Sequence, residues 1–567
     1  MSNDNRNFIT FAVIAALILF GWPVIAGRLF PPANPPVTRI EGGKTKVVPN
    51  TTAPSPSTPA KTRDLKAVLG ESAGQRVAID TPTLKGSINL RGARIDDLVL
   101  SDYKETIAKN SPAIRLLSPV GTADAYYAQF GWQDNGLKPP STDTVWQASG
   151  DLLAPGKPVT LTAANGQGQV FGIELSVDDQ YMFTIRQTVV NKSGAPVSVA
   201  TTGLIGRAQQ SKDLDSWTIQ IGPMSVHDKK ADYNLNWKDV AASKPFTTNG
   251  GWLGFTDKYW LTALVPDQAS SFAGQFTAPT GQGYAADYAR AATSLAPGKA
   301  LTQTSRFFAG AKEVRMIDHY SDNHFAPMLD YAIDWGWFRI IEKPIFYYLD
   351  WLFRMVGNFG VAIMLLTVTI RGLIFPIAQR QFASMASMRA IQPKMKALQE
   401  RYKDDKQRQQ QEIMKLYKTE KVNPLAGCLP TLIQIPIMYS LYKVLMLTIE
   451  MRHQPFVAWI KDLSAPDPLT PINLFGLLDF VPPHWIAIGV VPILLGISMW
   501  LQFRMNPAPM DEAQKQVFAL MPWVLMFVMA PFAVGLQVYW ITSNLLTVLQ
   551  QKVLYARHPA LKQPVVK

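Results

Sequence analysis

The sequence has few of the residues that most enzymes and metal proteins use for chemistry. Its 567 residues include a single cysteine, Cys428, and six histidines. One cysteine can form neither an intrachain disulfide nor a Cys-x-x-Cys metal or redox motif. None of the histidines stands in a His-Glu-x-x-His zinc motif. We therefore expect no metal ion, no cofactor and no catalytic residue, and we predict that the protein is not an enzyme.

One weak nucleophile motif is present. GESAG, from Gly70 to Gly74, matches the Gly-x-Ser-x-Gly pattern of hydrolase nucleophile elbows. It comes before most of the strands that would have to present such a serine, and no oxyanion-loop motif precedes it. A loop serine is the better interpretation.

Charge is scarce in the C-terminal part of the chain, where long apolar runs dominate. The segment Phe8–Ala26 is also apolar and is interpreted as an uncleaved anchor, or alternatively as a signal peptide. Together with this segment, the apolar runs make six candidate spans. The others are 357–377, 425–447, 485–503, 517–532 and 533–549. The net charge is +13, which in a membrane protein first indicates topology and anionic lipid headgroups. No RNA-binding, zinc-finger or helix-turn-helix motif is present, so we expect no specific nucleic-acid partner.

The order of composition along the chain predicts a polytopic α-helical membrane protein with a large antiparallel β-sandwich domain. Short strand patterns separated by turn residues fill the polar part, as in YMFTIRQTVVNKSGAPVSV. Residues 329–356 mix aromatic and charged side chains, which suits either a helix in the headgroup plane or an amphipathic helix packed on the β domain. The predicted parts are 1–30 (anchor), 31–63 (flexible Pro/Thr/Ser linker), 64–328 (β domain), 329–356 (amphipathic helix), 357–555 (membrane core) and 556–567 (tail).

The loop 380–422 sets the orientation. It contains eleven basic and five acidic residues, a net charge of +6, so the positive-inside rule places it in the cytoplasm. With six spans, both termini then lie in the cytoplasm and the β domain, which has no cysteine, lies in a periplasm. A helical seam with 3-4 spacing is formed within the loop by Met388, Ile391, Met395, Leu398 and Tyr402. A second helix follows the turn at Asp404–Asp405. The loop is thus a basic helical hairpin.

Arg371 is the one charge inside the span 357–377, in the stretch TVTIRGLIFP. It lies six residues from the cytoplasmic end of the span, roughly 9 Å deep at helical rise. Thr367 shares its helix face. Gln434 in the third span and Tyr539, Trp540, Ser543 and Asn544 in the last span add further polar groups. Together they suggest a water-filled cavity open to the cytoplasm; the alternative is that Arg371 snorkels to the headgroups.

Three stretches closely resemble the YidC/Oxa/Alb family of membrane-protein insertases, and the whole chain resembles its Gram-negative form. They are TVTIRGLIFP, KVNPLAGCLPTLIQIPI and YWITSNLLTVLQQ. The resemblance implies a bacterial inner-membrane protein with a five-helix core and a β-super-sandwich in the periplasm. It also implies insertion and folding of nascent membrane proteins, alone or beside the Sec translocon, with contacts to the ribosome and to membrane lipids.

The resemblance also implies site residues. Arg371, Thr367 and Gln434 match a substrate groove in the inner leaflet, completed by Tyr539, Trp540, Ser543 and Asn544. The cytoplasmic hairpin would make its contacts through Met385, Met388, Arg389, Lys394, Lys396 and Arg401. Two residues depart from the family pattern. Trp540 stands where a second tyrosine is common, and Lys443 is a charge in the outer part of the third span, where we expect it to snorkel outward.

Two other classes of protein fit parts of the sequence. A solute transporter or channel would need a path to both sides and usually has repeated halves. The chain shows no internal repeat, and Arg371 and Lys443 are its intramembrane charges. An envelope-stress sensor would use the β domain to bind a ligand, but no cytoplasmic signalling domain is present.

Overall fold

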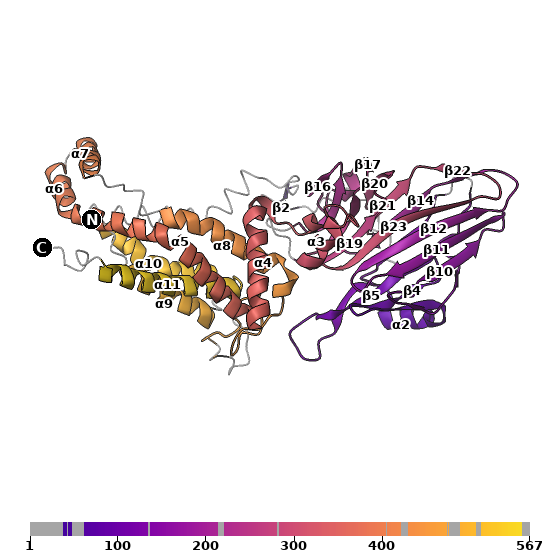
Figure 1. Cartoon of the computed structure of the whole chain (residues 1–567), viewed down its shortest axis with the longest axis horizontal. Helices are drawn as coiled ribbons and strands as arrows, with labels where there is room; N and C mark the ends of the chain where they lie inside the picture. Colours follow the sequence, from indigo (N-terminus) through magenta and orange to yellow (C-terminus); the bar gives the residue numbers. More distant parts are fainter. Residues whose placement is uncertain are drawn as a thin grey trace. The chain divides into compact units, whose positions relative to one another are not determined.

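The computed structural model describes residues 38–41, 44–47, 62–133, 137–213, 220–279, 283–403, 405–420, 429–472, 475, 488–505 and 512–557. The chain divides into two compact units (Figure 1). The β unit comprises Pro56–Trp337 and, from a distant part of the sequence, Leu447–Arg452. The helical unit comprises Met1–Ser55, Phe338–Met446 and His453–Lys567. The predicted anchor (1–30) lies outside the described residues, as does most of the predicted tail (556–567).

Two large antiparallel sheets form the β unit. The first has nine strands in the order β16 (Lys230–Asp232), β15 (Gly222–His227), β18 (Trp252–Thr256), β19 (Trp260–Val265), β23 (Ala300–Ala311), β12 (Met182–Asn191), β11 (Gln169–Val177), β10 (Val159–Ala164) and β8 (Gln147–Ala148). The second has ten in the order β17 (Phe246–Asn249), β20 (Ser271–Thr277), β21 (Tyr284–Arg290), β14 (Thr201–Arg207), β7 (Tyr126–Trp132), β5 (Arg94–Lys104), β4 (Leu84–Asn89), β3 (Arg76–Asp80) and β9 (Leu152–Leu153), with β6 (Ala113–Leu117) paired to β5. The β9–β3 pair is the parallel one.

Alternation of apolar and polar residues explains why these segments form sheets. Along β7 and β11 every second side chain is buried, which is the period of a strand with one face on a core. Phe171 from β11, Phe183 from β12 and Phe307 from β23 are fully buried. Burying one such side chain stabilises the fold by about 1.5–3 kcal/mol. The predicted antiparallel β domain is confirmed.

Short elements complete the β unit. They are the strand pair β13 (Val197–Val199) and β22 (Thr293–Leu295), the helices α2 (Leu65–Glu71) and α3 (Val314–Asp322), and the 3-10 turns η1 (Ala73–Gln75), η2 (Val240–Ala242), η3 (Leu329–Ala332), η4 (Gly336–Phe338, whose last residue belongs to the helical unit) and η6 (Ile449–Met451).

The segment Leu447–Arg452, which contains η6, contacts the rest of the β unit through the side chains of Glu450 and Arg452. Glu450 Oε1 accepts a hydrogen bond from the backbone N–H of Val314, the first residue of α3, at 2.8 Å. Arg452 donates to the carbonyl oxygens of Lys104 and Glu105 at 2.8 and 3.1 Å. Its guanidinium also lies over the ring of Trp260, 5.7 Å from the centroid. These contacts explain why a segment so far along the chain belongs to this unit.

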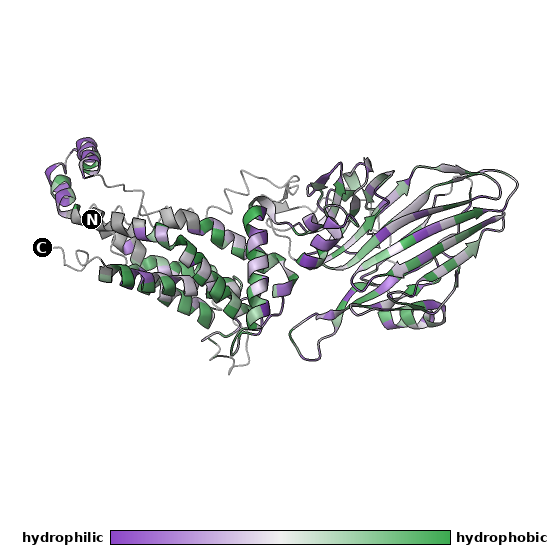
Figure 2. Ribbon diagram, viewed as in Figure 1, coloured by the Kyte–Doolittle hydropathy of each residue, from purple (hydrophilic) through white to green (hydrophobic). Residues whose placement is uncertain are grey.

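The helical unit contains α4 (Arg339–Val356), α5 (Phe359–Ala390), α6 (Gln392–Arg401), α7 (Lys406–Thr419), α8 (Leu429–Leu447), α9 (Val490–Met505), α10 (Glu512–Met529) and α11 (Val534–Arg557). The final residue of α8 belongs to the β unit. α11 packs against α5 and α9, α10 packs against α9, and α4 packs against α5. In Figure 2 the helices α9, α10 and α11 are mostly apolar, whereas α7 is mostly hydrophilic. The structure also places a two-strand hairpin, β1 (Thr38–Glu41) with β2 (Lys44–Val47), inside the segment predicted as linker.

Among the described helices, one is long and apolar enough to cross a membrane: the Phe359–Gln379 part of α5. Its 21 residues extend about 30 Å, the thickness of a bilayer core. Val490–Met505 and Ala519–Met529 are shorter apolar helices. Six spans and a five-helix core therefore remain predictions. α5 continues to Ala390, so the first part of the predicted hairpin 380–422 extends this helix, and the hairpin itself is α6 and α7.

The amphipathic segment forms a helix over part of its predicted length. α4 begins at Arg339, and 3-10 turns occupy the residues before it. It ends at Val356, and the next residue, Gly357, has a φ of +68°, which favours glycine. One face is buried, with Leu349 fully covered, while Ile340, Trp351 and Met355 remain 84, 50 and 63% exposed. Exposed apolar side chains on one face are what an interfacial helix requires; its place in the membrane remains a prediction.

Candidate functional site

The helix α11 presents buried polar side chains toward three neighbouring helices. Tyr539, Ser543 and Asn544 are 1–2% exposed. Tyr539 and Ser543 are four residues apart and therefore share a face. Polar groups buried among apolar helices lower the free energy only when their hydrogen bonds are satisfied. Each of these three side chains has a partner on a different helix.

Arg371 of α5 pairs with Ser543 of α11. The guanidinium Nε donates to the Ser543 hydroxyl at 2.9 Å, and Nη2 donates to the same oxygen. Gln550, two turns further along α11, donates to the backbone carbonyl of Arg371 at 3.4 Å. Among the described residues, no carboxylate lies within 4 Å of this guanidinium. Arg371 is therefore held in place by neutral groups, and its positive charge is not neutralised by a described acidic side chain.

Gln434 of α8 lies against Tyr539 of α11. Its side-chain amide donates to the tyrosine hydroxyl at 2.5 Å. The sequence placed both residues in one groove, and the structure brings them into contact. Since α5 and α8 both bond to α11 through groups one helical turn apart, α11 is the common element of the site.

Two residues predicted for the site lie differently. The hydroxyl of Thr367 is buried and donates to the carbonyl of Ile363 in its own helix at 2.6 Å, a common use of threonine in helices. It therefore does not act as the partner of Arg371. Trp540 is half-buried, and no described polar group bonds to its indole nitrogen. The expectation that Lys443 snorkels outward was wrong, because its side chain is 2% exposed.

The remaining polar residue, Asn544, contacts a helix that sequence reasoning did not include in the site. Its amide donates to the Ser498 hydroxyl of α9 at 2.9 Å. Gln537, also on α11, is fully buried and donates to the carbonyls of Met529 and Phe532 at 2.9 Å, which fixes the turn between α10 and α11. Ser498 and Gln550 were missed as site residues. For Ser498, a lone polar residue in an apolar run was the only available signal.

The hairpin of α6 and α7 is held by contacts between its two helices. The Tyr417 hydroxyl donates to the sulfur of Met395 at 3.3 Å, which confirms Met395 as a seam residue. Lys394 forms an ion pair with Glu420 at 2.6 Å, with the lysine side chain 64% exposed. Lys396 and Arg401 are also exposed. The side chains of Met385, Met388 and Arg389 lie outside the described residues.

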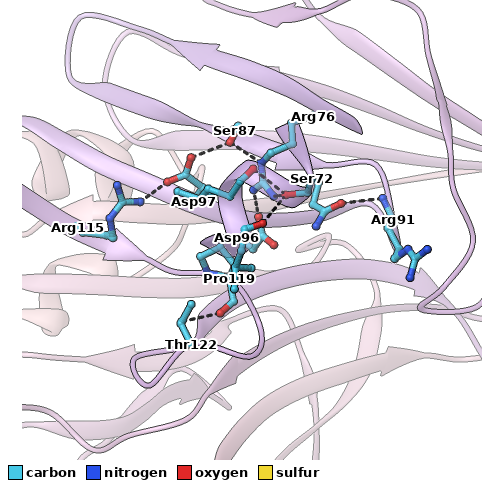
Figure 3. A network of polar contacts seen from close by, with 12 residues as sticks. Ser72, Arg76, Ser87, Arg91, Asp96, Asp97, Arg115, Pro119 and Thr122 are labelled. Carbon is cyan, nitrogen blue, oxygen red and sulfur yellow. Dashed lines mark hydrogen bonds and ion pairs between the residues drawn. The ribbon is translucent and has the colours of Figure 1, made fainter. Parts of the chain in front are cut away.

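The serine of the GESAG motif has a structural role. Ser72 donates to the carbonyl of Val68 at 3.1 Å and accepts a hydrogen bond from Arg76 at 3.0 Å. Figure 3 shows the network to which it belongs. Arg76 pairs with buried Asp96, and Ser87 joins Arg76 to Asp97 at 2.8 and 2.7 Å. Burial raises the pKa of Asp96, and Arg76 opposes that rise. Ser72 thus helps to fix a buried cation.

No cluster of three metal-ligating side chains occurs in the part of the chain that the structure describes. His319, for example, contacts the Asn323 amide at 3.0 Å. Apart from the Arg371 guanidinium, the described site consists of hydroxyl groups and side-chain amides. Such groups can bind and orient a polar or anionic ligand by hydrogen bonding, but the set contains no activated nucleophile or acid–base pair.

The helical unit is a bundle of apolar helices whose polar side chains face one another, and the same chain contains a large antiparallel β domain. This combination defines a membrane protein with an extensive domain outside the lipid.

Two family models match the chain. Residues 76–348 match the YidC periplasmic domain, and residues 351–561 match the 60Kd inner membrane protein family. A protein named membrane protein insertase YidC from Zymomonas mobilis is 48% identical, over 98% of this chain and 96% of its own length. A protein of the same name from Beijerinckia indica is 44% identical over the same shares. The chain belongs to the YidC family of membrane protein insertases.

Solved structures show more distant similarity. The crystal structure of an active YidC insertase aligns over 95% of this chain and 98% of its own, at 14% identity and a TM-score of 0.36. A galactose mutarotase related enzyme from Lactobacillus acidophilus aligns over 41% of this chain and 97% of its own, at 12% identity and a TM-score of 0.28. At these scores neither structure bears on what the chain does.

Proposed function

We propose that the protein inserts and folds inner-membrane proteins through a hydrophilic groove that is open to the cytoplasm. It acts both without the Sec translocon and beside it, on nascent chains delivered by ribosomes. Its β domain lies in the periplasm and both termini lie in the cytoplasm. Family membership supports the insertase role, and the polar contacts of α5, α8 and α11 support the groove.

The observation that carries the groove is the environment of Arg371. A guanidinium is costly at membrane depth and normally has a protein or water partner. Its described partner is the neutral Ser543 hydroxyl, at 2.9 Å. An acidic group in a substrate would supply the missing counter-charge, and the interaction is strong where water is scarce.

The proposed reaction needs no covalent chemistry and no nucleotide. The polar flank of a nascent helix enters the groove from the cytoplasm, where Arg371 attracts its acidic side chains and Tyr539 and Gln434 offer further hydrogen bonds. The apolar segment then moves sideways into lipid, because burial of apolar surface away from water lowers its free energy. The groove shortens the apolar distance that the flank must cross.

The test is reconstitution of the purified protein in liposomes with no other protein. Two short single-span clients, one with an acidic and one with a neutral translocated flank, are translated beside the vesicles and scored by protease protection. Arg371→Ala should reduce protection of the acidic client roughly tenfold, because a hydrogen bond to a charged group contributes about 1.5–3 kcal/mol. Arg371→Lys keeps the charge and should retain most of the activity.

The neutral client is the internal control, and Arg371→Ala should affect it less. Equal loss for both clients would mean that Arg371 has a structural role. No protection of either client by the wild-type protein would contradict insertase activity in isolation. Ion or solute flux in the same vesicles would then favour the transporter or channel.

A further inference from the structure

The hairpin of β5 and β6 ends in the turn 105–112, which carries an exposed apolar side chain (Figure 1). Ile107 is 57% exposed, more than any other large apolar side chain in the described part of the β unit. A single exposed apolar residue is common on protein surfaces and alone indicates nothing. Ile107 differs because its turn is ordered, is flanked by lysines and is tied to the segment that follows the predicted span α8.

Hydrogen bonds inside the turn occupy much of its backbone. The N–H of Glu105 donates to the Pro112 carbonyl at 3.0 Å. The N–H of Ser111 donates to the Ala108 carbonyl at 3.0 Å. The N–H of Thr106 donates to the Ser111 hydroxyl at 2.9 Å, and that of Ala108 donates to the Thr106 hydroxyl at 3.3 Å. Backbone groups that already have partners lose little when lipid replaces water, so this turn can enter a headgroup layer.

The base of the turn is tied to the residues that follow α8. Arg452 donates to the carbonyls of Lys104 and Glu105 at 2.8 and 3.1 Å. It follows Leu447, the last residue of α8, by five residues, so the two Cα atoms lie at most about 18 Å apart. In the proposed topology α8 runs from the cytoplasmic hairpin to the outer side of the membrane. The turn therefore lies near the outer surface of the bilayer.

The charges near the turn almost cancel. Lys104, Lys109 and Arg452 are basic, and Asp102 and Glu105 are acidic, which gives a net charge of +1. The Lys104 ammonium donates to the Lys109 carbonyl at 3.1 Å, whereas the Lys109 side chain is exposed. An exposed lysine can lay its stem on an apolar surface while its ammonium reaches phosphate groups. With so little net charge, apolar contact must supply most of the attraction to a membrane.

We propose that the turn 105–112 is a lipid-contact site of the β unit. Ile107 enters the boundary between headgroups and acyl chains in the outer leaflet, and Lys109 reaches the phosphates. The contact fixes one end of β5 at the bilayer surface, and the bonds from Arg452 fix the same end to the segment after α8. The proposal rests on the topology given under the proposed function, but it involves neither a client nor a ribosome.

Fluorescence quenching by lipid tests the contact in the full-length protein. Ile107→Cys is introduced together with Cys428→Ser and labelled with a nitrobenzoxadiazole maleimide. The protein is reconstituted in phosphatidylcholine vesicles that contain a lipid with a nitroxide near its headgroup. Because an interfacial side chain is buried among the headgroups, we expect quenching at least about twofold greater than at the control position described next. Equal quenching at the two positions would overturn the proposal.

Val145→Cys is the matched control, in the same Cys428→Ser protein. Val145 is 47% exposed and forms a bridge with Arg91, which precedes the first residue of β5. The 11 residues of β5 extend about 35 Å, so this position lies far from the turn in the same unit. The probe there reports how strongly the label is quenched without a membrane contact.

A probe on a neighbouring residue tests the role of Ile107 itself. The label is placed at Asn110→Cys, which is exposed, and Ile107 is kept or changed to Asp or Leu. Ile107→Asp should lower quenching to the level of the control position, because a carboxylate is excluded from the acyl boundary. Ile107→Leu should retain it. Unchanged quenching in Ile107→Asp, with the β unit still folded by pulse proteolysis, would overturn the proposed contact.

Lipid composition separates an apolar contact from an electrostatic one. Addition of anionic phosphatidylglycerol, or of salt, should change the quenching by less than about twofold. Quenching that needs anionic lipid and disappears in high salt would overturn the apolar contact. These samples contain no client, so a failure of client insertion would contradict the proposed function and leave the quenching result unaffected.

Discussion

Lys312 is a fully enclosed cation in the β unit, 2% exposed. Its ammonium donates to the Thr256 hydroxyl at 3.0 Å and to the Ala332 carbonyl at 3.2 Å. Burial lowers the pKa of Lys312 from 10.5 to about 8, and nearby carboxylates, Asp257 first among them, only partly oppose this. Below pH 8 both the folded and the unfolded chain hold this proton, so the cost of burying the charge is present in full.

The free energy of unfolding of the β unit should therefore rise with pH between about 8 and 10.5. In this window the unfolded chain binds a proton on residue 312 that the folded chain has released, and the rise from this residue reaches about 3 kcal/mol. Lys312→Met should remove that part of the rise. Pulse proteolysis in urea at pH 7.5 and 9.5, scored on fragments of the β unit, measures it.

The matched control is Lys212→Met. The Lys212 side chain is 80% exposed, so this substitution should leave the pH dependence of the free energy of unfolding unchanged. If Lys312→Met shows the same increase with pH as the wild-type protein, Lys312 does not titrate in this range.

In the helical unit, the sequence predicted a site residue when its side chain was of a kind that is rare in apolar segments, such as a charged one. Arg371 stood out because it was a charge in an apolar segment, and the structure gives it a polar partner, Ser543. Thr367 shared its helix face but bonds within its own helix. Spacing along one helix says which side chains face the same way, whereas their partners depend on how helices pack. For the same reason Ser498, which is one polar residue in an apolar run, gave no usable signal.

At the scale of elements, the hairpin of α6 and α7 carries exposed basic side chains. The guanidinium groups of Arg401 and Arg408 both lie over the ring of Tyr402, each 5.8 Å from its centroid. Asp405 caps the start of α7 by accepting from the Arg408 N–H at 3.0 Å. The sequence predicted both helices and the turn between them. It did not predict that α5 would continue to Ala390, because the apolar run that defines the span ends near Ile377 and the helix continues through polar residues.

Charge reversal in this hairpin should weaken ribosome binding. Lys394, Lys396 and Arg401 are each changed to Glu, which replaces attraction to phosphate with repulsion. We expect roughly a tenfold or greater loss of binding near 0.1 M salt, and a smaller difference at higher salt. Co-sedimentation with purified ribosomes measures the affinity. The opposite change, Glu412→Lys, should strengthen binding; equal binding by all variants would exclude the hairpin as the contact.

At the scale of the whole molecule, the sequence predicted the two kinds of domain but not their internal order. Strand patterns indicated an antiparallel β domain, and apolar runs indicated a helical one. Strand β12 pairs with β23, which places Met182 opposite Phe308 although the two residues are far apart in the sequence. Such pairing depends on tertiary contacts, which no local pattern records. The membership of Leu447–Arg452 in the β unit was unpredictable for the same reason.

The charge asymmetry of the chain predicts its orientation in the membrane. With Cys428 changed to Ser, a single cysteine at Lys212 in the β unit or at Lys415 in α7 can be labelled. A membrane-impermeant maleimide added to spheroplasts should react with Lys212→Cys and leave Lys415→Cys unlabelled. Inverted membrane vesicles should give the reverse result. Labelling of both positions from the same side would contradict the predicted topology.

The two-part construction of the β unit has a consequence for the order of its biogenesis. Leu447 follows Trp337 by 110 residues, so the ribosome must add those residues before η6 exists. At roughly 5–20 residues per second this takes about 5 to 20 s. During that interval the N–H of Val314 lacks its hydrogen bond to Glu450, and the ring of Trp260 lacks its contact with the Arg452 guanidinium. The β unit therefore cannot be completed until α8 has been synthesised, and its final step of folding marks the arrival of that helix.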